Sequence, residues 1–191
     1  FSDIAAQLFD EHNISESGSD AYWELLDLLQ AGTPLTAAQT AAAEALELRA
    51  VEEAQLYEDV GPSLGELKGM GISLVVASSL SEAAVRRFLR KFDIEGLFSA
   101  VWSRDNAGGV KTVPLARAIE DGGFQPDHVM SLADTAQSLE AAKQVGAHGI
   151  LMFNDYDEGK RLAAQGPAGG IVSLHELPDA IRFVAEGDKR R

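Results

Sequence analysis

The sequence predicts an α/β protein with a doubly wound, mainly parallel sheet, a Rossmann-like core and helices on both faces. From Leu64 onward, short apolar runs alternate with segments of helical period, which is the pattern of right-handed βαβ units. Ile72–Ala77 (ISLVVA) is almost wholly apolar, which is typical of a strand covered on both faces. A chain of 191 residues, 46% of them apolar, can form one such domain with a small insertion.

Before this alternating region the chain is alanine-rich and predicts two helices. The first begins near Ser19 and ends at Gly32. Its apolar residues recur at i, i+3, i+4 and i+7, namely Tyr22, Leu25, Leu26 and Leu29. Thr36 and Gln39 predict a capping box for a second helix that runs to about Tyr57. Together the two helices predict a small antiparallel unit.

The elements after Ile72–Ala77 are expected to continue the alternation. They are a helix at 81–92, a strand at 98–102, a helix at 113–120, a strand at 128–133, a helix at 135–145, a strand at 149–153, a helix at 157–165, a strand at 171–174 and a helix at 177–185. In such a sheet, ligands bind beyond the carboxyl ends of the strands. Polar residues that follow the apolar runs are therefore the candidate site.

Composition excludes several classes of function. The formal net charge of −14 argues against a nucleic-acid binder, which needs basic surface, and makes any phosphate ligand dependent on a local cation. No apolar stretch reaches the 18–20 residues of a membrane span, no signal peptide is visible, and there is no cysteine, so we expect a cytoplasmic protein. The chain begins with Phe1 rather than Met, so we expect further residues upstream to complete a first strand.

Three polar residues follow apolar runs, and each has a purely structural explanation. Asp134 closes H-V-M-S-L-A and could cap the next helix. Ser78 follows L-V-V-A and could fill a turn, with Ser79 and Glu82 forming a capping box. Lys111 precedes a helix opened by a proline, where a lysine is usually a solvated loop charge.

Taken together, however, the order and spacing of these residues are similar to the motifs of the haloacid dehalogenase (HAD) superfamily. L-V-V-A-S-S-L resembles the second motif, with Ser78 and Ser79 at the phosphate-binding positions, and G-V-K-T-V-P resembles the third, with Lys111 as its lysine. S-L-A-D-T-A-Q-S-L-E resembles the fourth motif, in the branch of β-phosphoglucomutase and phosphoglycolate phosphatase, with Asp134 at a metal-ligand position. D-I-A-A-Q-L-F-D resembles a degenerate first motif, with Asp3 as nucleophile.

This resemblance implies a core of residues 1–12 and 64–191 and a reduced helical cap at 13–63. It implies a Mg²⁺-dependent phosphatase of small phosphate monoesters, in which the Asp3 carboxylate attacks phosphorus and forms an aspartyl-phosphate. Asp3 and Lys111 are then the catalytic residues, and Ser78, Ser79 and Lys111 bind the substrate phosphate. Asp3, the backbone carbonyl of Ala5 and Asp134 are the expected metal ligands. The implied partner is a small phosphorylated metabolite, and the chain is a monomer or a homodimer.

One expected residue is absent, and this leaves two functions open. Ala5 stands where these phosphatases carry an acid/base aspartate, and general acid–base help is worth about 10²–10⁴-fold in rate. The chain is either an impaired phosphatase or a catalytically inactive HAD-like pseudoenzyme that binds a phosphometabolite or a protein partner. No lysine lies between Asp10 and Leu67 to form the Schiff base of a phosphonoacetaldehyde hydrolase. Arg49 is the single arginine of the cap, so a dehalogenase is possible but unsupported.

Overall fold

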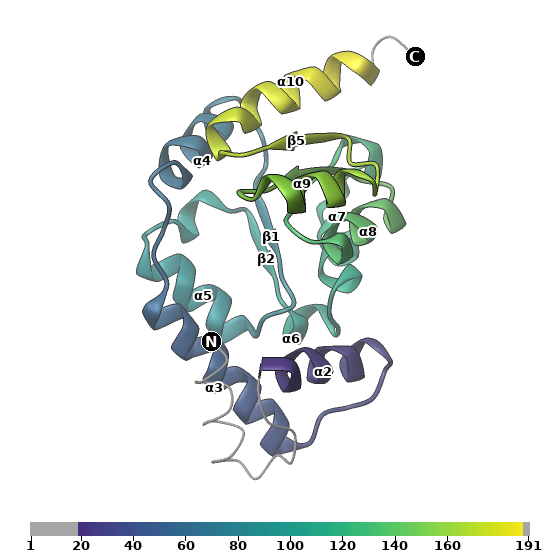
Figure 1. The fold of residues 1–191 in the computed structure, drawn as a ribbon. Coiled ribbons are helices and arrows are strands. Elements are labelled where there is room, and N and C mark those ends of the chain that lie inside the picture. Colours follow the sequence, from purple (N-terminus) through teal and green to yellow (C-terminus); the bar gives the residue numbers. More distant parts are fainter. Residues whose placement is uncertain (1–18, 189–191) are drawn as a thin grey trace.

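The structure is a computed structural model that describes residues 19–188 (Figure 1). Helices and parallel strands alternate along most of this range, and the α/β class is confirmed. Its helices are α2 (Ser19–Gln30), α3 (Ala37–Glu53), α4 (Val60–Gly69), α5 (Glu82–Lys91), α6 (Arg104–Ala107), α7 (Thr112–Gly122), α8 (Ala136–Gln144), α9 (Tyr156–Ala163) and α10 (Leu177–Asp188). Its strands are β1 (Val75–Ala77), β2 (Ala100–Trp102), β3 (Met130–Ala133), β4 (His148–Met152) and β5 (Gly169–Ile171). Short 3₁₀ turns lie at Glu95–Leu97, Pro126–His128 and Leu174–Glu176.

The described strands form two parallel sheets, one of order β1-β2 and one of order β3-β4-β5. Within residues 19–188, β1 and β3 are therefore each paired along one edge only. The expectation that Ile72–Ala77 is a fully buried strand is wrong here, because the strand is confined to its last three residues, of which Val75 and Val76 are half-buried and Ala77 is exposed. A strand with one paired edge lacks the neighbour whose side chains would complete its cover.

The predicted capping box at the start of α3 is confirmed. Thr36 Oγ1 accepts a hydrogen bond from Gln39 N at 3.2 Å, and Thr36 N donates to Gln39 Oε1 at 2.9 Å. The helix ends at Glu53, so the expected extension to about Tyr57 is wrong. The ammonium of Lys91 on α5 donates to three carbonyl oxygens at this end of α3, those of Val51, Glu52 and Ala54. These contacts satisfy carbonyl groups that a helix terminus leaves unpaired. No local sequence pattern predicts them, because Lys91 lies on another helix.

The α2–α3 pair packs on the loops that follow the strands. Its buried cluster consists of Tyr22, Leu25, Leu26, Ala42, Ala43, Leu46 and Val110, with Leu80 packed against it. Val110 directly precedes Lys111, and Leu80 directly follows Ser79. The two helices therefore lie over the carboxyl-end loops of the α/β part, as Figure 1 shows at its lower edge, and this places them beside the candidate site.

The segment before helix α4 contacts the C-terminal region through Asp59, the residue directly before this helix. Helix α4 itself was not predicted as a separate element. The carboxylate of Asp59 accepts hydrogen bonds from Ser173 Oγ at 2.7 Å and Leu174 N at 2.8 Å, and these bonds lower the pKa of Asp59.

In the described range, no helix has both the length and the apolar character that a bilayer crossing requires.

Candidate functional site

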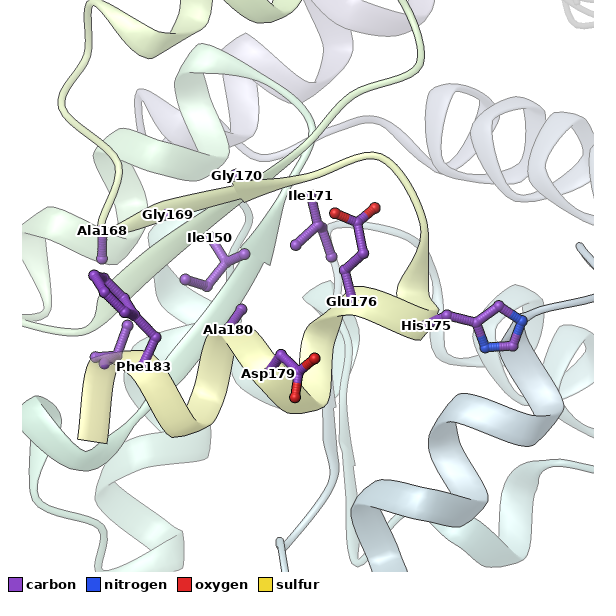
Figure 2. A pocket seen from close by; sticks show the side chains of 11 residues that line it. Ile150, Ala168, Gly169, Gly170, Ile171, His175, Glu176, Asp179, Ala180 and Phe183 are labelled. Atoms are coloured by element: carbon purple, nitrogen blue, oxygen red, sulfur yellow. The ribbon is translucent and has the colours of Figure 1, made fainter. Parts of the chain in front are cut away.

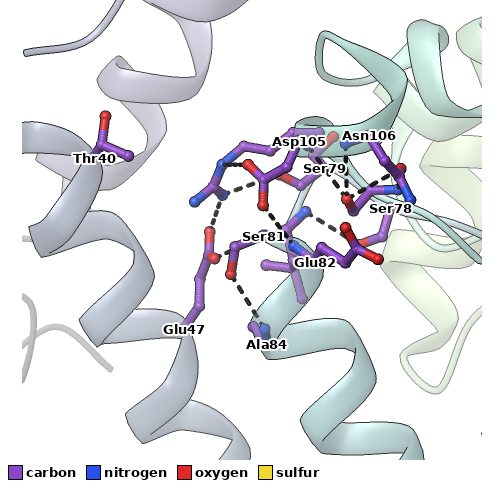
Figure 3. A network of polar contacts seen from close by, with 12 residues as sticks. Thr40, Glu47, Ser78, Ser79, Ser81, Glu82, Ala84, Asp105 and Asn106 are labelled. Carbon is purple, nitrogen blue, oxygen red and sulfur yellow. Dashed lines mark hydrogen bonds and ion pairs between the residues drawn. The ribbon is translucent and has the colours of Figure 1, made fainter. Parts of the chain in front are cut away.

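The candidate site is built on the loop after β1. Ser78 N continues the parallel pairing by donating to Trp102 O at 2.9 Å, and Ser78 Oγ accepts a hydrogen bond from Leu80 N at 3.2 Å. Ser78 therefore closes a tight turn at the carboxyl end of β1 (Figure 3). This is the edge at which parallel sheets bind ligands.

Ser79 and Lys111 are brought together by the fold. Ser79 Oγ accepts a hydrogen bond from the backbone N–H of Lys111 at 2.7 Å. Lys111 has φ of 59° and ψ of −105°, a conformation rare for a residue with a side chain and one that needs support from its surroundings. The expected capping box of Ser79 with Glu82 is wrong, because Ser81 caps α5 by accepting from Ala84 N at 3.2 Å. The Ser79 hydroxyl supports Lys111 instead.

The ammonium of Lys111 points to α2. Lys111 Nζ lies 2.7 Å from Asp27 Oδ1 and 2.5 Å from Gln30 Oε1. The Lys111 side chain is 13% exposed, whereas that of Asp27 is 65% exposed. The lysine is thus not a freely solvated loop charge. Its cationic end links the α/β part to the helical pair.

Asp134 directly follows β3 and is exposed. It is not the helix cap, because Thr135 caps α8 through a hydrogen bond from Ser138 N at 3.1 Å. The Asp134 carboxylate accepts a long hydrogen bond of 3.5 Å from Ser138 Oγ. The capping explanation therefore does not account for this residue, and its carboxylate is accessible at the sheet edge.

Of the three metal ligands predicted for this edge, only Asp134 lies in the described part of the chain. Asp3 and Ala5 lie outside the described residues, and among residues 19–188 no three acidic or histidine side chains converge to hold a metal ion. A single exposed carboxylate falls short of a Mg²⁺ site, because the ion prefers six oxygens in octahedral geometry. The described residues thus supply one of the three predicted ligands.

A buried charged network holds the serine loop from the other side (Figure 3). Glu47 on α3 forms a buried ion pair with Arg104 on α6. Glu47 Oε1 also accepts a hydrogen bond from Tyr22 Oη at 2.8 Å, and its other oxygen accepts from Ser81 N at 2.9 Å. Arg104 Nη1 donates in turn to Ser79 O at 3.2 Å. The loop of residues 79–81 is therefore fixed by groups from α3 and α6.

Burial and the neighbouring Glu47 carboxylate raise the pKa of the Tyr22 phenol. Tyr22 therefore stays protonated and donates, which is the role that its hydrogen bond to Glu47 requires. The sequence patterns gave no indication of the roles of Glu47, Arg104 and Asp27. One signal was available for Glu47, which lies four residues after the buried Ala43 and next to Leu46, on the apolar side of α3.

Two pockets lie away from this loop. One, of about 440 Å³, is formed by β5 and α10 and is mainly apolar, with Ile150, Gly170 and Phe183 among its lining residues (Figure 2). The other lies between α3 and α5. Neither is lined by Ser78, Ser79, Lys111 or Asp134.

Residues 11–152 match the profile of the family described as haloacid dehalogenase-like hydrolase, and the chain therefore belongs to this family. The matched range includes Ser78, Ser79, Lys111 and Asp134 but begins after Asp3 and Ala5. The match therefore adds no support to the first motif.

Two curated relatives differ in their described activities. The tyrosine-protein kinase PtkA of Mycobacterium tuberculosis is 34% identical over 97 residues, which are 50% of this chain and 32% of the kinase. A phosphoglycolate phosphatase of Synechococcus elongatus is 28% identical over 127 residues, which are 66% of this chain and 59% of that protein. The chain thus spans between a third and three fifths of the length of these two relatives.

Solved structures agree with the fold. A predicted phosphoglycolate phosphatase from Haemophilus somnus superimposes with a TM-score of 0.71 over 93% of this chain and 88% of its own, at 17% identity. CbbY from Rhodobacter sphaeroides, in complex with phosphate, gives a TM-score of 0.70 over 92% of this chain and 87% of its own, at 20% identity. At these identities the likeness speaks for the fold alone.

Proposed function

We propose that this chain is a hydrolase of small phosphate monoesters and that it binds the phosphate at the loops after β1, α6 and β3. The observation that carries the proposal is the hydrogen bond from Lys111 N to Ser79 Oγ, which joins two predicted phosphate-binding residues from separate loops. A hydroxyl and an ammonium at one sheet edge are the groups that a phosphoryl oxygen needs. The phosphoglycolate phosphatase among the relatives and the phosphate complex among the structural neighbours support the same substrate class.

In this proposal the polar residues of the site serve phosphate binding, nucleophilic attack and metal binding. Ser78 and Ser79 donate hydrogen bonds to phosphate oxygens, and Lys111 balances their negative charge. Asp3 supplies the carboxylate that attacks phosphorus, and Asp134 binds Mg²⁺ together with Asp3 and the carbonyl of Ala5. A bound Mg²⁺ would neutralise charge on the phosphoryl group. The wider proposal has residues 1–12 and 64–191 as core and 13–63 as cap, in a cytoplasmic protein.

The second candidate is a binding protein without turnover. Two observations favour it: Ala5 cannot transfer a proton, and among residues 19–188 the Lys111 ammonium is bound by Asp27 and Gln30 of α2. Such a protein would keep phosphate affinity through Ser79 and Lys111 and would lack hydrolysis. The two candidates share one site and differ in chemistry.

The deciding experiment is hydrolysis of p-nitrophenyl phosphate and a panel of small phosphate monoesters, with and without Mg²⁺. The phosphatase proposal expects Mg²⁺-dependent release of phosphate that Asp134→Ala abolishes. Asp157→Ala, which removes an exposed aspartate from α9, is the matched control and should retain activity. Phosphate binding without hydrolysis in every condition would select the binding protein, and absence of both would reject the site.

A further inference from the structure

We propose that Asp27 competes with the substrate phosphate for the ammonium of Lys111, so that a ligand must displace a carboxylate of α2 from the site. This inference rests on the proposed function, since it concerns regulation of the same phosphate site. It makes α2 an internal inhibitor whose carboxylate takes the place of a phosphate oxygen.

The first support is the geometry of the ammonium. Within residues 19–188 its hydrogen bonds go to Asp27 Oδ1 at 2.7 Å and to Gln30 Oε1, and both acceptors lie in the last part of α2. An ammonium has three donors, so α2 takes two of them. Because both acceptors belong to one helix, a small movement of that helix would release both donors together.

The second support is the way in which the lysine backbone is held. The N–H of Lys111 is bound by Ser79 Oγ at 2.7 Å, and the residue has positive φ. The backbone of Lys111 is thus attached to the serine loop while its ammonium is attached to α2. Exchange of Asp27 for a phosphate therefore leaves the backbone of Lys111 in place and needs only the ammonium to change partner.

The third support is the unequal burial of the two partners. The Asp27 side chain is 65% exposed and can return to water at little cost, whereas the Lys111 side chain is 13% exposed. The neighbouring cation, Arg104, is not available for exchange, because it is buried and paired with Glu47. A phosphate dianion attracts the ammonium more strongly than a single carboxylate does. Lys111 is therefore the cation of this loop region that a phosphate can capture.

The test compares affinities for inorganic phosphate and orthovanadate, measured by isothermal titration calorimetry at fixed Mg²⁺ and low salt. Asp27→Asn removes the competing charge and should tighten binding by about two- to fivefold, the range set by ion pairs with an exposed partner. Glu24→Gln makes the same change of net charge on an exposed position of the same helix and should leave affinity unchanged. In the background of Lys111→Met, Asp27→Asn should have no effect, because the contested ammonium is gone.

The outcomes separate this inference from the proposed function. Suppose that wild type binds phosphate, that Lys111→Met lowers this affinity, and that Asp27→Asn and Glu24→Gln have the same affinity. This result overturns the competition and leaves the phosphate site standing. If Asp27→Asn binds phosphate and wild type does not, the competition is supported in its strongest form. If Lys111→Met matches wild type, or if neither wild type nor Asp27→Asn binds, Lys111 is not a phosphate ligand and both proposals fall.

Discussion

Among the charged contacts that join the α2–α3 pair to the α/β part, Glu47–Arg104 and Asp27–Lys111 differ in almost every physical respect. In the Glu47–Arg104 pair the side chains are 1% and 6% exposed. In the Asp27–Lys111 pair they are 65% and 13% exposed. Both pairs reach the loop of residues 79–81 or its neighbour Lys111, so the same candidate site is held by one buried contact and by one contact with an exposed partner.

The difference in exposure separates a structural contact from the contact that we propose to exchange on phosphate binding. Glu47 has further partners in Tyr22 and Ser81, so its charge is satisfied where water cannot reach. Removal of one member of such a pair leaves an unbalanced buried charge, which is costly. The carboxylate of Asp27, by contrast, can exchange Lys111 for water. The Glu47–Arg104 pair therefore fixes the serine loop. The Asp27–Lys111 pair, in our proposal, leaves the Lys111 ammonium available to a phosphate.

The largest expected effect is that of Glu47→Ala. It leaves Arg104 buried without a counter-charge and should lower the free energy of unfolding by about 3–5 kcal/mol. Urea denaturation followed by circular dichroism measures this change. Glu53→Ala is the control on the same helix, because Glu53 pairs with Arg49 at the surface, and it should cost about 0.5 kcal/mol or less. Equal costs in the two variants would contradict the structural role of the buried pair.

The next effect is that of Tyr22→Phe, which removes one hydrogen bond to a charged acceptor and should cost about 1.5 kcal/mol at neutral pH. Burial and the Glu47 carboxylate raise the pKa of Tyr22 in the native state, so above about pH 10 only the unfolded state loses this proton. Wild type should therefore lose stability as pH rises through this region more steeply than Tyr22→Phe does. Denaturation between pH 9 and 11 (roughly one unit either side of the ordinary tyrosine pKa) measures the difference.

The control for that experiment is Tyr57→Phe, because Tyr57 is 71% exposed and distant from the pair along the chain. It should keep the alkaline slope of wild type. A slope shared by wild type and Tyr22→Phe would mean that the Tyr22 phenol ionises as readily in the native state as in the unfolded one.

The smallest effect is expected at the exposed pair. A double-mutant cycle of Asp27→Asn and Lys111→Met in urea denaturation should give a coupling free energy of about 0.2–1 kcal/mol. Salt at about 0.5 M should reduce it further, because the Debye length is then only a few ångströms. A coupling as large as the cost of Glu47→Ala, or one that salt leaves unchanged, would make Asp27–Lys111 a structural pair and weaken the case for exchange.

Features governed by neighbouring residues were predictable. The capping box of Thr36 and Gln39, the end of α2 shortly before the positive-φ Gly32 and the buried face of Tyr22, Leu25 and Leu26 all depend on residues within one or two helical turns. The placement of Ser78, Ser79, Lys111 and Asp134 after apolar runs was likewise visible in order. Asp3 and Ala5 remain predictions, since they lie outside the described residues.

Most of the errors share one physical cause, which is dependence on groups distant in the sequence. Helix α3 ends where Lys91 binds its carbonyls, about 40 positions away. The burial of β1 depends on which strands lie beside it, and the role of Ser79 depends on Lys111, 32 positions away. A local pattern contains no information about such partners. The cap of α5 is a local error, because Ser79 and Ser81 are both suitable caps and lie two positions apart.

The sequence by itself determined the α/β class, most of the helices and strands from β1 onward and the family to which the chain belongs, because periodicity and motif order depend on residues close together in the chain. Only the tertiary structure decided what each charged side chain does. Glu47 meets Arg104 at a separation of 57 positions, and Asp27 meets Lys111 at a separation of 84. Whether a charge is a buried anchor or an exchangeable ligand depends on its exposure and its partner, and both are fixed only when distant segments pack together.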